Sequence, residues 1–274
     1  MNDLLSNPAV QAGVAPFAVA LIVAALARST RLLGLAIGAA FVTVIALTIG
    51  FSFESLTSMR KMVLLALAAG VLVLPLELAS IQPSARVRVA LAATAGLGAV
   101  WMVLRVLQQQ ETGAALAGGI GAAAFAAALV ESGHAVRDDP VRAACVALML
   151  GLGAGVLALL GASVTLTQVG VAIGSGAGAA LLVQMVTGRR APLGWTLAFP
   201  ASVTASLVGL LSVATGVLRW YCLLPLLAVP WATRLVPALQ RPVWLTAILT
   251  SLAALVPAAL AVALAWVGGT SSAA

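Results

Sequence analysis

The chain has 274 residues, of which 63% are hydrophobic and only 8% are charged. A water-soluble domain carries about 25% charged residues, so this composition excludes a soluble fold. The formal net charge of +7 does not indicate nucleic-acid binding, because the arginines lie singly or in pairs between apolar runs and form no basic patch. We expect an all-α, polytopic membrane helix bundle that forms a single transmembrane domain, 1–274, in contact with the lipid bilayer.

Ten apolar segments follow one another, separated by charged, polar or proline-containing stretches such as RSTR (28–31) and GRRAP (188–192). Each is close to the roughly 20 residues that a membrane-spanning helix needs. The ninth segment is short and holds Pro225, Pro230 and Pro237, so we expect it to be kinked, re-entrant or broken. The expected spans are 8–27, 32–51, 62–80, 87–107, 113–133, 142–161, 166–187, 193–217, 220–237 and 243–267.

Lysine and arginine gather on one side of this ten-span arrangement. The loops after the odd-numbered segments carry ten basic residues: Arg28, Arg31, Arg86, Arg88, Arg137, Arg142, Arg189, Arg190, Arg234 and Arg241. The loops on the other side carry four: Arg60, Lys61, Arg105 and Arg219. Because cytoplasmic loops hold the excess of basic residues, both termini are predicted to be non-cytoplasmic. The high alanine, glycine, leucine, valine and arginine content is typical of a GC-rich bacterium, so the expected location is a bacterial inner membrane.

The middle of the chain falls in its most polar loop, HAVRDDPVR (134–142), which leaves five spans on either side. Two halves with five spans each have opposite topologies, as in many secondary transporters. A local similarity supports this division, since Gly34–Gly38 reads GLAIG and Gly170–Gly174 reads GVAIG. We therefore consider an inverted pseudo-repeat of 1–136 and 137–274. The alternative, a coincidence between two glycine- and alanine-rich helices, stays open.

Glu77 is a carboxylate in an apolar segment, two residues after Pro75. An ionised group at the bilayer centre costs about 2.5–3.5 kcal/mol on insertion scales, so its presence needs a reason. One interpretation is structural anchoring near the end of the third span, with Arg86 or Arg88 as the ion-pair partner. The other is a protonatable or cation-binding group on a transport path, beside a backbone carbonyl that Pro75 leaves without a donor.

Two further sets of polar residues are candidates for function. Gln168, Gly174, Ser175 and Gln184 lie in the seventh segment, where they either hydrogen-bond and pack across helices or line a solute path. The second interpretation includes local unwinding of 170–180. A second set, Glu131 and His134, closes the fifth span in the densest charged cluster of the chain. It is either a solvated loop with local ion pairs or a gate or partner contact.

The sequence gives little support to membrane enzymology. His134 is the only histidine, and the chain has no H-E-x-x-H, G-x-S-x-G or Walker motif. We therefore expect no catalytic residues, no cofactor and no metal site, and we interpret Cys145 and Cys222 as buried thiols.

Two functions remain. The favoured one is a small-solute or ion transporter of the secondary carrier type, which predicts a polar cavity near the midplane. The alternative is a non-catalytic membrane subunit or assembly partner of a larger complex. A subunit predicts solid packing and an exposed apolar or small-residue face that fits other membrane subunits.

Overall fold

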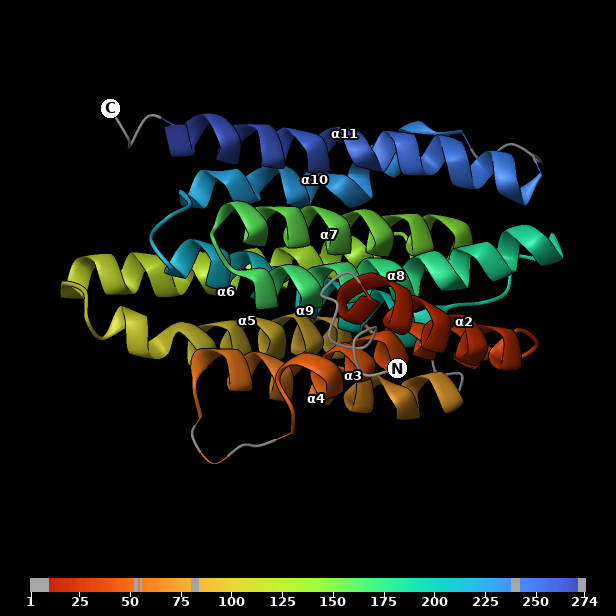
Figure 1. Ribbon diagram of the computed structural model, residues 1–274, viewed down its shortest axis with the longest axis horizontal. Coiled ribbons are helices and arrows are strands. Elements are labelled where there is room, and N and C mark those ends of the chain that lie inside the picture. The colour runs from red at the N-terminus through yellow and green to blue at the C-terminus, as the bar shows by residue number, and fades with distance from the viewer. Residues whose placement is uncertain (1–9, 52–53, 55, 80–83, 238–241, 271–274) are drawn as a thin grey trace.

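The computed structural model describes residues 10–51, 54, 56–79, 84–237 and 242–270, and this part of the chain is helical with no strand (Figure 1). Nine of its helices are long and apolar enough to cross a membrane. The chain is therefore an all-α, multi-pass membrane helix bundle. The elements are η1 (Val10–Val14), α2 (Ala15–Ala27), η2 (Arg31–Gly34), α3 (Leu35–Thr48), α4 (Ser58–Leu78), α5 (Ala85–Leu107), α6 (Thr112–His134), α7 (Pro140–Leu160), α8 (Val164–Thr187), α9 (Gly194–Ala214), η3 (Trp220–Leu223), α10 (Leu224–Ala232), η4 (Thr233–Leu235) and α11 (Val243–Thr270).

Local sequence sets several of the helix ends. The Asp139 side chain accepts hydrogen bonds from the backbone N–H groups of Val141 and Arg142, and Pro140 occupies the first position of α7. Ser163 caps α8 in the same way. At its other end α8 stops at Gly188, whose φ of +63° is left-handed and suits glycine. The polar breaks in the sequence therefore act as caps as well as loops.

The ninth expected span, 220–237, is broken, as its prolines predict. A 3-10 turn, Trp220–Leu223, leads into the short helix α10, and a second 3-10 turn, Thr233–Leu235, follows it. Pro225 stands at the start of α10 and Pro230 inside it. The segment packs on α11, α6 and α7 and runs from the end of α9 toward the start of α11 (Figure 1).

The centre of the bundle is α9. Every residue from Trp195 to Gly209 is buried, and the helix packs on α4, α6 and α7 and also contacts α3, α5 and α8. On one side of it, α7 and α8 approach closely through glycines: a Cβ on Gly170 would lie 2.5 Å from the Cα of Gly155. In a membrane the hydrophobic effect does not hold helices together, so their association depends on close packing, which small residues allow. Because α8 is one continuous helix from Val164 to Thr187, the backbone at 170–180 is not unwound.

The two similar glycine segments have different neighbours. A Cβ on Gly34 would meet Thr196 and Leu197 of α9, whereas one on Gly170 would meet Gly155 of α7. Both glycines therefore serve close packing, but against helices that do not correspond under an inverted repeat. The division into two inverted halves stays a prediction.

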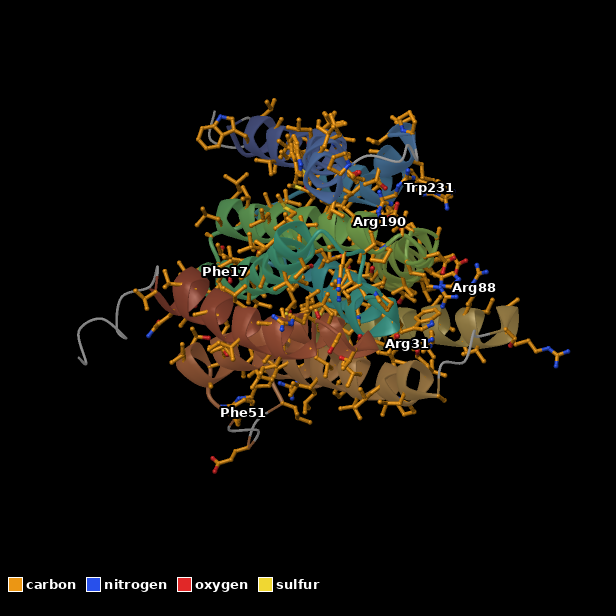
Figure 2. All side chains as sticks on the ribbon, turned by 90° about the vertical axis from the view of Figure 1, so that its right-hand side faces the viewer. Phe17, Arg31, Phe51, Arg88, Arg190 and Trp231 are labelled. Carbon is orange, nitrogen blue, oxygen red and sulfur yellow. The ribbon has the colours of Figure 1, made fainter. Side chains whose placement is uncertain are left out.

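The C-terminal ends of α2, α4, α6, α8 and η4 lie together at one end of the bundle, on the right in Figure 1. We call it the Arg-rich end. Figure 2 views the molecule from this side and labels Arg31, Arg88 and Arg190 there. Arg241 lies outside the described residues, as does the start of the first expected span.

Candidate functional site

Glu77 lies one residue before the end of α4 and is only 7% exposed. Its carboxylate accepts a hydrogen bond of 2.6 Å from the backbone N–H of Trp195, in the first turn of α9. The residue that precedes α9, Leu193, provides no side-chain cap. Glu77 therefore caps the central helix from a neighbouring helix, where a negative charge also interacts favourably with the helix dipole.

Gly194 makes this contact possible. It has a φ of +51°, and a Cβ at this position would overlap the Glu77 carboxylate. The carboxylate of Glu77 thus has a structural partner, but this partner is the N–H of Trp195 and not Arg86 or Arg88, as we expected. Arg88 forms an ion pair with Glu131 instead, which joins α5 to α6.

The side chain of Trp195 connects the capped helix end to the charged cluster at the end of α6. Its indole ring stacks on His134, with ring centroids 4.8 Å apart, and the guanidinium carbon of Arg137 lies 4.7 Å from the ring centroid. Arg137 also pairs with Asp138, Nε to Oδ1, at 3.3 Å. The structure therefore brings His134 and Glu77 to the same tryptophan, with Glu131 in the adjoining ion pair.

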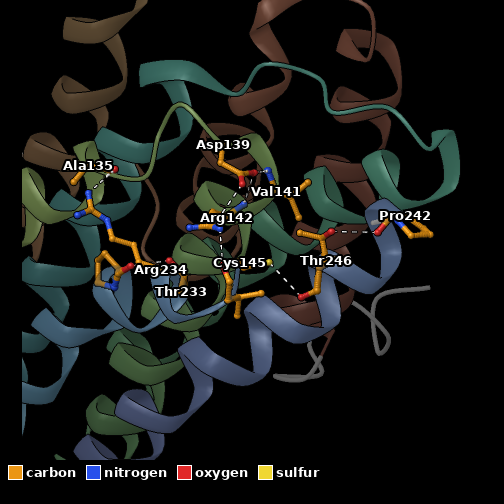
Figure 3. Close-up of polar contacts among 12 residues, drawn as sticks. Ala135, Asp139, Val141, Arg142, Cys145, Thr233, Arg234, Pro242 and Thr246 are labelled. Carbon is orange, nitrogen blue, oxygen red and sulfur yellow. Dashed lines mark hydrogen bonds and ion pairs between the residues drawn. The ribbon is translucent and has the colours of Figure 1, made fainter. Parts of the chain in front are cut away.

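Two arginines hold the neighbouring loops together (Figure 3). Arg142 pairs with Asp139 at 3.1 Å and donates a 2.7 Å hydrogen bond to the backbone carbonyl of Val236. Arg234 donates to the carbonyl of Ala135 at 2.9 Å. The α6–α7 connection and the start of α7 are thus joined to the segment after α10 by guanidinium–carbonyl contacts. The chemistry of this end is helix capping and charge pairing, which fixes the relative positions of six helices.

The polar residues of α8 do not form one site. Gln168 and Gln184 are 16 residues apart, or about 24 Å along a helix, and so lie near opposite ends of α8. Gly174 packs on the side chain of Leu152, and Ser175 is half-buried. Gln184 is fully buried, and both atoms of its amide group lack a hydrogen-bond partner in the part of the chain that the structure describes.

Three cavities lie between helices, and their linings are mainly apolar. One is bounded by α4, α5 and α9, a second by α6, α7 and α9, and a third by α7, α8 and α11. Ser202, Thr94 and Ser251 are the hydroxyl groups among their lining residues. Glu77, Gln168 and Gln184 line none of these three cavities.

Several residues of this arrangement were not expected from the sequence. Gly194 and Trp195 lie just after the loop GRRAP, separated from it by Leu193, and this glycine–tryptophan pair at the start of a span was the signal available in the sequence. At the opposite end, Lys61 is only 7% exposed, donates to the carbonyl of Trp101 at 3.0 Å and lies 4.9 Å from the centroid of its ring. Aromatic residues near span ends thus act as partners for cations as well as interfacial anchors.

The apolar helices make the chain a multi-pass membrane protein that contacts the lipid bilayer. The chain matches no protein-family model, no curated protein and no solved structure.

Proposed function

We propose that the chain is a non-catalytic membrane subunit that packs against a transmembrane helix of a partner subunit through α6. The observation that carries this proposal is a lipid-facing stripe of small residues on α6. These residues are Gly113, Ala117, Gly121, Ala124 and Ala128, and all five are exposed. A Cβ on Gly113 or Gly121 would meet nothing within 4 Å. Small residues at four-residue spacing, as at Gly113, Ala117 and Gly121, are typical of helix–helix interfaces in membranes.

The use of the interior polar groups also supports a subunit over a carrier. On α9, the hydroxyl groups of Thr204, Ser206 and Ser212 donate to carbonyls of their own helix, at 2.7 to 2.8 Å. Glu77 is occupied as a helix cap. A carrier needs polar groups that face a solute, whereas the three cavities between the helices have mainly apolar walls.

Cysteine cross-linking in native membranes tests this proposal. We expect Ala124→Cys to form a cross-linked product with a short thiol reagent. Val256 of α11 is 69% exposed, and Val256→Cys should form no such product. The mass of the product distinguishes a different subunit from a second copy of the chain. Gly121→Leu should abolish the complex on native gels, whereas Gly38→Leu, also exposed and with open space around it, should leave it intact. A chain that stays uncross-linked at position 124 and migrates alone contradicts the proposal.

One observation favours a secondary carrier as the second candidate. The buried amide of Gln184 has no partner among the described residues, and such a group is costly. A second conformation in which Gln184 meets a solute would supply that partner. Solute uptake that Gln184→Met abolishes, with the chain still folded, would favour this candidate over the first.

We also propose a bacterial inner membrane as the location, with the Arg-rich end in the cytoplasm. The support is the distribution of basic residues between the two ends, since cytoplasmic loops carry the excess.

A further inference from the structure

The third cavity described above, bounded by α7, α8 and α11, is an apolar groove that opens to the outside of the bundle. Leu181 and Met185 of α8, Met149 of α7, and Ala247, Ile248 and Leu252 of α11 are among the residues that line it. Ile248 is 45% exposed and Leu252 54% exposed, so the groove opens outward. In a bilayer it faces the hydrocarbon tails of the surrounding lipid.

The groove includes the last turns of α8, and two arginines follow shortly after that helix ends. Met185 is four residues before Arg189, and Gly188 turns the chain between them at the end of α8. Arg189 and Arg190 are both exposed. The helix thus carries apolar groove residues in its last turns, and two arginines follow its end, where a membrane-spanning helix is expected to meet the lipid headgroups.

No acid neutralises these two arginines in the described chain. The carboxylates that the structure describes at this end are all occupied: Glu77 by the N–H of Trp195, Glu131 by Arg88, Asp138 by Arg137 and Asp139 by Arg142. Neither Arg189 nor Arg190 forms an ion pair with any of them. Guanidinium groups bind phosphate through charge-assisted hydrogen bonds, and basic sites between helices at the cytoplasmic face recognise anionic lipid headgroups.

We propose that an anionic phospholipid binds here, with its phosphate at Arg189 and Arg190 and one acyl chain in the groove between α8 and α11. The two arginines fit a negatively charged headgroup and the groove fits a hydrocarbon tail, and one phospholipid molecule has both. A soluble phosphate would use the arginines alone. This site is separate from the small-residue face of α6 and does not depend on the subunit role.

Native mass spectrometry of the full chain in detergent, titrated with phosphatidylglycerol or phosphatidylcholine, tests the headgroup part. We expect a clear preference for phosphatidylglycerol. Replacing both arginines, Arg189→Gln with Arg190→Gln, should weaken phosphatidylglycerol binding about 25-fold, because each basic residue near an anionic surface contributes roughly a fivefold factor. The matched control is Arg105→Gln with Arg219→Gln, which removes the same charge at the opposite end and should leave binding unchanged.

The acyl-chain part needs a variant of the groove. Ile248→Trp should fill it and weaken phosphatidylglycerol binding with both arginines in place, and Leu255→Trp serves as a second variant if the first unfolds. Glycerophosphoglycerol, the headgroup without tails, should not compete. Equal phosphatidylglycerol binding by the double arginine variant and the native chain overturns the proposal. So does unchanged binding by a folded groove variant, or full competition by the soluble headgroup.

Discussion

The backbone N–H of Trp195 donates a 2.6 Å hydrogen bond to the carboxylate of Glu77, although 118 residues separate the two in the chain. Trp195 belongs to the first turn of α9, whose N–H groups have no partner within the helix. Glu77 belongs to the last turn of α4, which packs along α9. The carboxylate in this apolar helix is thus explained by the first turn of α9, whose backbone N–H groups need an acceptor from outside their own helix.

Removal of this cap should destabilise the bundle. We expect Glu77→Ala to lower the free energy of unfolding by about 1–3 kcal/mol, because it leaves a buried N–H without an acceptor and removes a charge from the helix N-terminus. Glu77→Gln keeps an acceptor and should cost less. Thermal unfolding in detergent measures both. The control is Glu54→Ala, because Glu54 is an exposed carboxylate in a loop. An equal loss of stability in that variant would contradict the capping role of Glu77.

Gly194→Ala should be more harmful than its backbone angle alone explains. Gly188 and Gly194 both have positive φ, and alanine there costs roughly 1–2 kcal/mol. A Cβ at Gly188 meets nothing within 4 Å, whereas one at Gly194 overlaps Glu77. We therefore expect Gly194→Ala to lower the unfolding temperature more than Gly188→Ala does. In a Glu77→Ala background the difference should shrink, and a difference that persists there would show that the overlap is not its cause.

The order and approximate bounds of nine of the ten expected spans could be predicted from the sequence, because a bilayer demands long apolar runs and polar breaks. The expected 87–107 and 166–187 correspond to Ala85–Leu107 and Val164–Thr187. The prolines of 220–237 predicted a broken segment, and the structure has one.

Which helices lie in the centre of the bundle and which face lipid could not be predicted from the sequence. The central helix α9 is no more hydropathic than α5, which faces lipid along much of its length. Lipid tails and a protein interior are equally apolar, so composition does not distinguish them. The partner of Glu77 was also not predicted. Arginines close to it in the sequence suggested an ion pair, whereas the group that donates to its carboxylate is a backbone N–H of α9, 118 residues further along the chain.

The contact between α7 and α8 should tolerate no side chain at Gly170. A Cβ there would lie 2.5 Å from the Cα of Gly155, so Gly170→Ala forces the helices apart and should cost about 1–3 kcal/mol. Gly38→Ala is the matched control because nothing lies within 4 Å of a Cβ at that position. It should be neutral or stabilise by up to about 1 kcal/mol through helix propensity. Equal unfolding temperatures for the two variants would contradict glycine-mediated packing.

Gln184→Met should stabilise the chain. It keeps a long, flexible side chain and removes an amide that has no partner among the described residues, which costs about 1–3 kcal/mol when buried. Gln168→Met is the control, because Gln168 is 8% exposed near the other end of the same helix and should gain less. Thermal unfolding decides between the outcomes. A loss of stability on Gln184→Met would mean that the amide has a bound partner, such as water or a solute.

The distribution of arginines predicts that the Arg-rich end lies in the cytoplasm. By sequence, the loops expected on that side hold ten basic residues, against four for the loops on the other side, and cytoplasmic loops carry the excess. An epitope inserted at Gly216, a turn glycine with φ +79° and open space around it at the opposite end, should be labelled in intact spheroplasts. An epitope inserted after Arg190 should be labelled only after permeabilisation. The reverse pattern would place the Arg-rich end outside, and the phospholipid bound at Arg189 and Arg190 would then belong to the outer leaflet.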